Sequence, residues 1–435
     1  MSTIELGEVS SAPGDEVRLP EFDRRVVFRV AAVVALLGCL FGMTASARPG
    51  PYAVHPLWKV PVTENDGATL GPAAVYITRA GDDAPRISAY ELASGAVQWT
   101  TKLDDALGYA QLDDDDHLLL LPTDFQNGVG FRIARATVAL DARTGTRLWS
   151  APGEPMVLSA GDALMADYTD NGGYAQLRLI RLDDRSTVWA HETPGVVSVA
   201  FALVGNRPDR FVTVTTDGRA EVRRLADGSL VAAARIPWVK ADPEQGWFND
   251  LAASSDHLMV NSNRNGHADL SVYRLDTLDR VWQADGTDGY AFPCGTGICV
   301  DNVSGLTAYD APTGRMRWRL DGIGNGWAAS DNRVVVSDLG DTGQQFLVDA
   351  ATGARVGPPG PGETVWTTEP GQALLVLRPT VSPPGRTSVT RWDLATGRRD
   401  LLGAIDWTSV NRCQARDRFL GCYQGNEYAV TAVGR

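Results

Sequence analysis

The stretch LTAYDAPTGRMRWRL, residues Leu306 to Leu320, contains two short strands separated by a tight turn. From Arg315 onward, arginine and apolar side chains alternate with the two-residue period of a half-buried β-strand. Between the strands, Asp310 can accept backbone N–H bonds, Pro312 presets its φ for a turn, and Gly314 supplies a positive φ. The stretch therefore predicts a β-hairpin. Its second strand is expected at a sheet edge, where arginines discourage pairing with other chains.

The hairpin recurs along the chain with a similar turn and, in most copies, a tryptophan at its end. Clear copies are VALDARTGTRLW ending at Trp149, AYELASGAVQW ending at Trp99, FLVDAATGARVG around Gly353, and VTRWDLATGRRDLL around Gly397. Weaker copies end at Trp189 and Trp282 and surround Gly228. Successive turns lie about 36 to 50 residues apart, which is the length of one four-stranded propeller blade. The repeat therefore predicts an all-β chain folded as a β-propeller of four-stranded blades.

Other short apolar runs are expected to supply the remaining strands. HLLLL at 117–121 is typical of a second strand of a blade, and GWAAS at 326–330 of an inner strand. LWKVPV at 57–62 has no hairpin partner before it, and EYAVTAV at 427–433 has none after it. Pairing these two segments would close the ring and remove two open sheet edges. We therefore expect residues 57–435 to form one closed propeller.

The repeated motif resembles the PQQ-like, or quinoprotein-type, β-propeller family. The resemblance rests on segments such as LDARTGTRLW and YDAPTGRMRW and covers nearly all of the chain after about residue 57. It implies a propeller that most often has eight blades, whereas a direct count of repeats gives nine, some weakly marked. We therefore favour eight blades within a range of seven to nine. The family includes alcohol dehydrogenases, outer-membrane assembly scaffolds and proteins without an assigned role, so the resemblance leaves the function open.

Tryptophans stand in six of the expected outer strands. An indole buries a large area per residue, which favours a role in packing over one in ligand binding. The residues expected to pack between blades are Trp58, Trp99, Trp149, Trp189, Trp282 and Trp318.

The N-terminal segment determines where we expect the protein to reside. Residues 1–25 are polar and rich in acidic side chains, which is typical of a disordered tail. Residues 26–47 are long and apolar enough for a transmembrane helix or an uncleaved signal anchor, and 48–56 would be a linker. Arginines at the start of the apolar stretch place the tail in the cytoplasm by the positive-inside rule. We therefore expect a single-pass cell-membrane protein with its propeller on the extracytoplasmic side.

Two other fates of the apolar segment are alternatives. ASA at 45–47 is typical of a signal-peptidase site, which would allow cleavage after Ala47. LLGC at 36–39 loosely resembles a lipoprotein box, which would place lipid on Cys39. Against these, the tail before the segment is long and acidic, and the apolar run continues past the cysteine.

Four cysteines outside the apolar segment form two closely spaced pairs. Cys294 and Cys299 bracket GTGI between two expected strands, and Cys413 and Cys422 bracket QARDRFLG at the same place in the last unit. Both spacings allow a disulfide across antiparallel strands, and an even number of cysteines suits an oxidising compartment. We predict two structural disulfides, with four reduced core cysteines as the alternative. No metal site is expected, because neither pair has C-x2-C spacing and the chain has only five histidines.

Composition and motifs argue against several classes of function. A net charge of −13, with no basic patch outside the N-terminal segment, argues against a nucleic-acid partner. The chain has no P-loop, no G-x-S-x-G elbow and no H-E-x-x-H pair. The segments 113–116, 167–173 and 261–269 are better interpreted as polar turns than as cation sites. Arginine far outnumbers lysine, and with the alanine, glycine and proline content this suggests a high-GC bacterial source.

A quinone cofactor is not expected. The resemblance implies, for the family's dehydrogenases, two adjacent cysteines over the quinone in many members and a calcium ion held by carboxylate and amide side chains. This chain has no adjacent cysteine pair, and we find no match to the calcium ligands. We therefore predict a monomeric module without a cofactor or catalytic site, which binds or scaffolds an unknown protein or cell-envelope ligand. The alternatives are a quinoprotein dehydrogenase and an envelope-assembly scaffold.

Overall fold

The computed structural model describes residues 53–434 except for the short segments 81–84, 105–109, 114, 128–131, 160, 206, 243, 266, 285–288, 303, 339–342, 368–370 and 372. The expected tail at 1–25 and transmembrane helix at 26–47 lie outside the described residues. Within the described part, no helix is both long and apolar enough to cross a membrane. Apart from the 3-10 turn η1 (Val410–Arg412), the described elements are β-strands, which confirms the all-β prediction.

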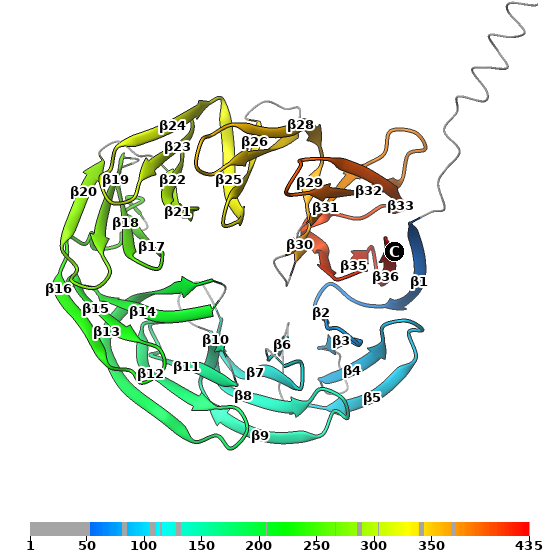
Figure 1. Cartoon of the computed structure of the whole chain (residues 1–435). Coiled ribbons are helices and arrows are strands. Elements are labelled where there is room, and N and C mark those ends of the chain that lie inside the picture. Colours follow the sequence, from blue (N-terminus) through cyan, green and yellow to red (C-terminus); the bar gives the residue numbers. More distant parts are fainter. Residues whose placement is uncertain are drawn as a thin grey trace, which may run out of the picture. The chain divides into compact units, whose positions relative to one another are not determined.

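The strands form consecutive antiparallel meanders of four, each running from the centre of a ring to its perimeter (Figure 1), which confirms the β-propeller. Blades 1 to 3 comprise β2 (Gly67–Leu70), β3 (Ala74–Arg79), β4 (Arg86–Glu91) and β5 (Val97–Lys102); β6 (Gln111–Leu112), β7 (Leu118–Asn127), β8 (Arg132–Asp141) and β9 (Arg147–Pro152); and β10 (Glu154–Ser159), β11 (Asp162–Tyr168), β12 (Tyr174–Arg181) and the first part of β13 (Thr187–Val204). Blades 4 to 6 comprise the rest of β13 with β14 (Arg207–Thr215), β15 (Arg219–Arg224) and β16 (Leu230–Arg235); β17 (Phe248–Ala253), β18 (His257–Arg264), β19 (His267–Arg274) and β20 (Arg280–Ala284); and β21 (Gly289–Cys294), β22 (Gly297–Asn302), β23 (Gly305–Asp310) and β24 (Met316–Asp321). Blades 7 to 9 comprise β25 (Ile323–Ser330), β26 (Arg333–Asp338), β27 (Gln344–Asp349) and β28 (Arg355–Pro361); β29 (Glu363–Thr364), β31 (Ala373–Pro379), β32 (Arg386–Asp393) and β33 (Arg399–Asp406); and β34 (Cys413–Arg416), β35 (Phe419–Gln424) and β36 (Glu427–Val433) with β1 (Val54–Pro61).

The number of blades depends on one long strand. Hydrogen bonding groups the described strands into eight sheets, which is the number that we favoured. One of these sheets has seven strands, because β13 pairs with β12 through its first part and with β14 through its second. β13 is therefore the outermost strand of blade 3 and the innermost strand of blade 4. Counted by four-strand meander, the described residues form nine blades, the upper end of the expected range.

The two ends of the described chain meet in blade 9. β1 pairs antiparallel with β36 and completes a blade whose other strands come from the C-terminal end (Figure 1). β1 begins at Val54, within the stretch 48–56 that we expected to be a linker. A second tie joins blades 8 and 9, because β30 (Trp366–Thr367) leaves blade 8 and pairs in parallel with β34. Both pairings close the ring where the chain ends meet.

Three of the clear outer hairpins share the same turn chemistry. Thr144 donates its backbone N–H and its hydroxyl to Asp141 Oδ1, at 2.7 and 2.8 Å. Gly145 follows with a φ of 71°, a region that strongly favours glycine. The same pair of bonds forms at Asp349 and Asp393. These local bonds explain why the repeat is legible in the sequence.

Tryptophans join neighbouring blades through one recurring contact. The indole of Trp318 in blade 6 lies against Gly353 in blade 7, and its Nε1 donates to the Ala350 oxygen at 3.0 Å. The corresponding bond to the next blade is made by Trp58, Trp99, Trp149, Trp189 and Trp282. Nine clusters of buried apolar side chains lie in the described residues, one at each interface between neighbouring blades. The core of the propeller is therefore divided among its blade interfaces.

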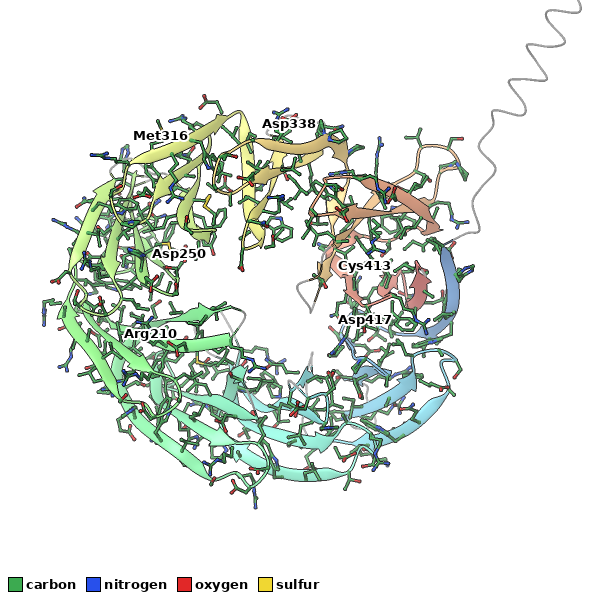
Figure 2. The ribbon with its side chains drawn as sticks, viewed as in Figure 1. Arg210, Asp250, Met316, Asp338, Cys413 and Asp417 are labelled. Carbon is green, nitrogen blue, oxygen red and sulfur yellow. A yellow bond between two sulfur atoms is a disulfide. The ribbon has the colours of Figure 1, made fainter. Side chains whose placement is uncertain are left out.

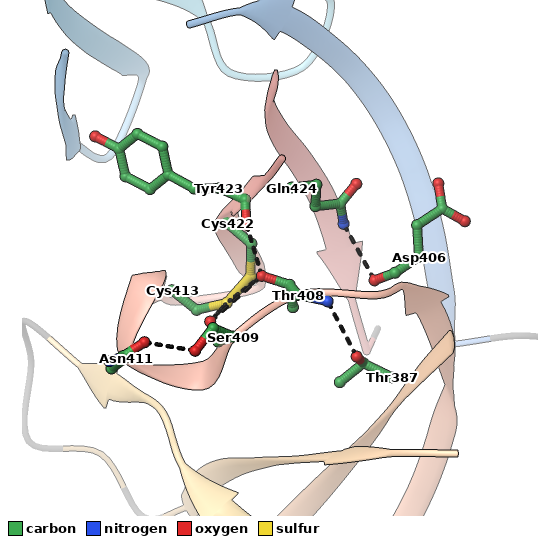
Figure 3. The surroundings of a disulfide bond; sticks show 9 residues. All are labelled: Thr387, Asp406, Thr408, Ser409, Asn411, Cys413, Cys422, Tyr423 and Gln424. Atoms are coloured by element: carbon green, nitrogen blue, oxygen red, sulfur yellow. Dashed lines mark hydrogen bonds between the residues drawn. A yellow bond between two sulfur atoms is a disulfide. The ribbon is translucent and has the colours of Figure 1, made fainter. Parts of the chain in front are cut away.

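Both predicted disulfides are present. Cys294 and Cys299 have their Cα atoms 5.7 Å apart, and Cys413 and Cys422 have theirs 4.2 Å apart. Each bond joins the first and second strands of a blade, as expected, but the two are not at the same place. The first closes the turn between β21 and β22, whereas the second bridges the opposite end of β34 and β35 (Figure 3).

Candidate functional site

The antiparallel meander fixes which connections share a face of the ring. Links between first and second strands and between third and fourth strands lie on one side, which we call the turn face. Links between second and third strands, and between successive blades, lie on the other side, which we call the connector face. The repeated turns belong to the turn face. The parts of the sequence that do not repeat therefore concentrate on the connector face and along the inner strands, where binding residues are expected.

Exposed aromatic side chains are found on the inner strands and one connector. Among the described residues, the perimeter strands expose aliphatic side chains such as Met316, whereas the exposed aromatic ones are Phe248, Tyr290, Trp327 and Trp407. The first three belong to β17, β21 and β25, the inner strands of blades 5, 6 and 7, and we call them the inner aromatic arc. They are 51%, 53% and 38% exposed. Aromatic side chains are enriched at protein interfaces, so the arc is a candidate contact surface.

Two carboxyl groups lie beside the arc. Figure 2 places Asp250 on the inner side of the ring, and burial raises the pKa of its carboxyl group. Burial also raises the pKa of the Tyr290 phenol, and the charge of Asp250 adds to this shift. Asp301 accepts a hydrogen bond of 2.9 Å from the backbone N–H of Gly326 across the interface of blades 6 and 7, and burial raises its pKa. The arc therefore combines aromatic surface with acceptors for hydrogen bonds from a partner.

A groove of about 590 Å³ lies on the connector face where blades 7, 8 and 9 meet. We call it the connector-face groove, and its volume is within the range of small-molecule sites. Its polar lining side chains are Asn325, Ser337, Gln345, Glu363, Arg378, Thr408 and Ser409. Its apolar lining side chains are Pro361, Leu377, Pro379, Trp407 and Val410. The indole of Trp407 is 56% exposed, so a flat apolar surface stands beside a largely polar wall.

The wall of the groove contains a polar atom without a partner. Gln345 is 8% exposed, and its Oε1 has no hydrogen-bond partner among the described residues. Behind it, Arg399 donates to the backbone oxygens of Gln345 and Pro361, at 2.9 and 3.3 Å. The guanidinium lies 3.8 Å from the ring centroid of Trp392, and burial lowers the pKa of Arg399 to about 10. Because buried polar groups are nearly always hydrogen-bonded, this oxygen is a position where a ligand donor would fit.

Hydrogen bonds hold the segment around Trp407, and Figure 3 shows those of the next residue, Thr408, beside the disulfide of blade 9. The backbone N–H of Trp407 donates to the Gly385 oxygen at 3.1 Å. Thr408 is 2% exposed, and its Oγ1 donates to the Tyr423 oxygen at 2.7 Å. The Cys413–Cys422 disulfide lies against the same hydroxyl, with Cys413 Sγ 3.6 Å from it. The disulfide of blade 9 thus supports the rim of the groove.

The segments that we interpreted as polar turns adopt turns, with one difference. In the run 113–116, Asp113 is 9% exposed, and its Oδ1 accepts the backbone N–H groups of His117 and Leu118 at 2.7 and 2.8 Å. Asp116 forms an ion pair of 2.8 Å with Arg416. Asp113 and Asp116 are therefore partly buried and hold the turn in place, although the run was interpreted only as a polar turn. The segments 167–173 and 261–269 lie at the links between second and third strands of blades 3 and 5, and both include the end of the second strand.

Sequence reasoning did not single out the arc, Trp407 or Gln345. A usable signal existed, because the chain has 12 tryptophans and only six occupy the repeated position. Trp327 and Trp407 are among those off the repeat, and both are exposed. Nothing in the sequence around Gln345 predicts that it is buried, because residues of blade 8 such as Arg399, far along the chain, pack beside it.

This chain is similar to many solved structures. No protein-family model matches it, and no curated protein matches it. Among solved structures, BamB from Moraxella catarrhalis is 13% identical, with 87% of this chain and 99% of that chain covered and a TM-score of 0.44. The dihydro-heme d1 dehydrogenase NirN in complex with DHE is 15% identical, covering 72% and 68%, with a TM-score of 0.41. A eukaryotic initiation factor is 10% identical, covering 81% and 90%, with a TM-score of 0.53. At these identities the likeness concerns the fold alone.

The residues present do not fit the calcium-bound quinone of the dehydrogenases in the family that the repeat resembles. The four cysteines of the propeller are paired within blades 6 and 9, not over the ring centre as adjacent residues. In the part of the chain that the structure describes, no three His, Cys, Asp or Glu side chains gather so as to hold a metal ion. We therefore derive no step through a quinone.

Proposed function

We propose that this chain is a membrane-anchored member of the PQQ-like propeller family that acts without catalysis, as a monomeric binding scaffold for a protein partner. The inner aromatic arc carries the proposal. Its three side chains belong to inner strands of consecutive blades, so one partner could contact all of them. Tyrosine and tryptophan are the residues that most often dominate the binding energy of protein interfaces. The perimeter strands, in contrast, expose aliphatic side chains beside the inter-blade tryptophans.

We further propose that residues 26–47 anchor the propeller on the extracytoplasmic side of the cell membrane. The uncharged stretch after Arg29 is about as long as a bilayer span, and arginines precede it. The two disulfides support an exported propeller, because such bonds persist in oxidising compartments. Protease added to intact cells should digest the propeller, and carbonate washing should leave the protein in the membrane. Protection from the protease would contradict this location.

Site-specific photo-crosslinking in the native membrane tests the scaffold proposal. A photoreactive residue replaces Tyr290 or Trp327 in the full-length chain, and Met316 serves as a control because it is 61% exposed and lies at the perimeter (Figure 2). We expect the same discrete adduct from positions 290 and 327 and none from position 316. In a chain carrying Phe248→Ala, the adduct should weaken. No adduct from the arc, or an equal one from the perimeter, would refute the proposal.

A further inference from the structure

We propose that the connector-face groove binds a neutral saccharide of one or two rings. This site is separate from the inner aromatic arc, and the two proposals stand or fall independently. Three features of the groove favour such a ligand: the flat indole of Trp407 at the rim, the unpartnered amide oxygen of Gln345 in the wall, and the balanced charge of the lining.

Trp407 supplies a platform for the apolar face of a sugar ring. A pyranose has a face of C–H bonds that stacks on an indole, while its hydroxyl groups point outward along the ring edge. The indole is 56% exposed, although burying aromatic surface is strongly favourable. Its backbone is fixed by the bond to Gly385 and by buried Thr408 next to it. The platform is therefore preorganised, which reduces the entropy lost on binding.

Gln345 supplies the most specific polar contact. Its side chain is more than nine-tenths buried and lines the groove, and its Oε1 lacks a partner among the described residues. A buried acceptor without a donor costs about 1 to 3 kcal/mol in general. A sugar hydroxyl can donate to this oxygen and accept from a neighbouring group at the same time. Asn325, Ser337 and Ser409 line the same groove and offer the further donors and acceptors that vicinal hydroxyls require.

The charge of the lining favours a neutral ligand. Glu363 and Arg378 are its two charged side chains, one of each sign, and both are exposed. A carboxylate and a guanidinium can each take a pair of hydroxyl groups by bidentate hydrogen bonds. A purely apolar ligand would bury polar groups of the lining such as the Gln345 oxygen without giving them a hydrogen-bond partner. A peptide added as a strand needs an open strand edge, whereas this groove is built from strand ends and connectors.

Isothermal titration calorimetry with the full-length protein in detergent tests the site. The probes are three neutral disaccharides, cellobiose, maltose and N,N′-diacetylchitobiose. We expect at least one to bind, with affinity reduced about tenfold by Trp407→Ala because stacking is lost. Gln345→Leu, which keeps the apolar packing but removes the acceptor, should weaken binding about fivefold. Trp407→Phe should recover part of the loss.

Trp327→Ala is the matched control, since this exposed indole belongs to the arc and does not line the groove. It should leave the affinity for the disaccharide unchanged, while Trp407→Ala should leave the photo-adducts of the arc unchanged. The saccharide proposal is overturned if none of the three probes binds, or if binding survives both Trp407→Ala and Gln345→Leu in folded protein. Binding of a proline-rich decapeptide in place of the disaccharides would also overturn it.

Discussion

The packing of Trp318 of blade 6 on Gly353 of blade 7 is one example of the tryptophan contact that joins neighbouring blades, which we call the inter-blade latch. A matched pair of glycines allows this latch to be tested. Gly353 has a φ of 71°, and a Cβ added to it would lie 2.7 Å from Cγ of Trp318. Gly161 has a φ of 84°, and a Cβ added there would meet no heavy atom within 4 Å. An alanine at either position would have a strained, positive-φ backbone, which costs about 1 to 2 kcal/mol in both cases. Only Gly353→Ala adds steric crowding against an indole, which costs about 1 to 3 kcal/mol.

The expected result is therefore a difference between the two variants. Gly161→Ala should lower the free energy of unfolding by about 1 kcal/mol. Gly353→Ala should lower it by about 3 kcal/mol, because strain and crowding add. Urea unfolding followed by tryptophan fluorescence measures both values. Equal destabilisation of the two variants would refute the idea that the indole occupies the space a side chain at 353 would need.

A double-mutant cycle attributes the difference to the indole itself. Trp318→Ala alone should cost about 3 to 5 kcal/mol, because it removes a large buried side chain. It also leaves the Ala350 oxygen without the 3.0 Å bond from Nε1. In this background, Gly353→Ala should cost only the backbone strain, giving a coupling of about 1 to 3 kcal/mol. If the free-energy changes of Trp318→Ala and Gly353→Ala simply add, the crowding at position 353 does not come from the Trp318 indole.

Three further predictions follow from the described contacts. In unfolded but unreduced full-length protein, an alkylating reagent should modify Cys39 alone, and the four other cysteines should react only after reduction. Labelling of all four before reduction would contradict both disulfides. The hydroxyl of Thr352 holds the pKa of the Asp349 carboxyl below its usual range, so the stability that this bond contributes is present above the unfolded pKa of about 3.9 and is lost as the pH falls through the folded value. Thr352→Val should accordingly destabilise the protein at pH 7, and this loss should shrink as the pH falls below the unfolded pKa of about 3.9. A pH-independent loss measured by urea unfolding would refute the linkage. Arg399→Lys should cost about 2 kcal/mol, because lysine lacks the planar fork that reaches the backbone oxygens of both Gln345 and Pro361, and unchanged urea unfolding would contradict this role.

The repeated elements could be predicted from sequence because their chemistry is local. The turn at Asp141 uses the side chain and backbone of Thr144, three residues away, and Gly145 completes it. The same bonds form at Asp349 and Asp393, where the same residue types recur at the same spacing, so these hairpins can be recognised in the sequence. The tryptophan at the hairpin end then predicts burial, although the sequence does not say that its partner is a glycine of the following blade.

The number of blades could not be fixed from the sequence because the boundary between blades 3 and 4 lies within the continuous strand β13. Pro194 and Gly195 suggest a turn between two blades, yet the strand continues through them and serves both. Blade 4 also lacks a tryptophan in its outer strand, where Ala232 pairs with Val222. A missing loop and a missing indole together weaken the signal of this unit. Its place in the ring became clear only from the pairing of β13 with strands on both sides.

The candidate sites lie where the repeat fails, and this has a physical reason. Where a tryptophan of one blade packs on the next, that position is needed for packing and is not free to vary with a ligand. The inner strands and connectors carry no such constraint, and their contacts bring together residues far apart in the chain. Arg399 reaches back to the oxygen of Gln345, and Thr408 is fixed by Tyr423 beside a disulfide. A ring of latched blades can therefore hold Trp407 and Gln345 rigidly without specifying what they bind, so variation in a few connector residues is enough to change the ligand while the propeller stays intact.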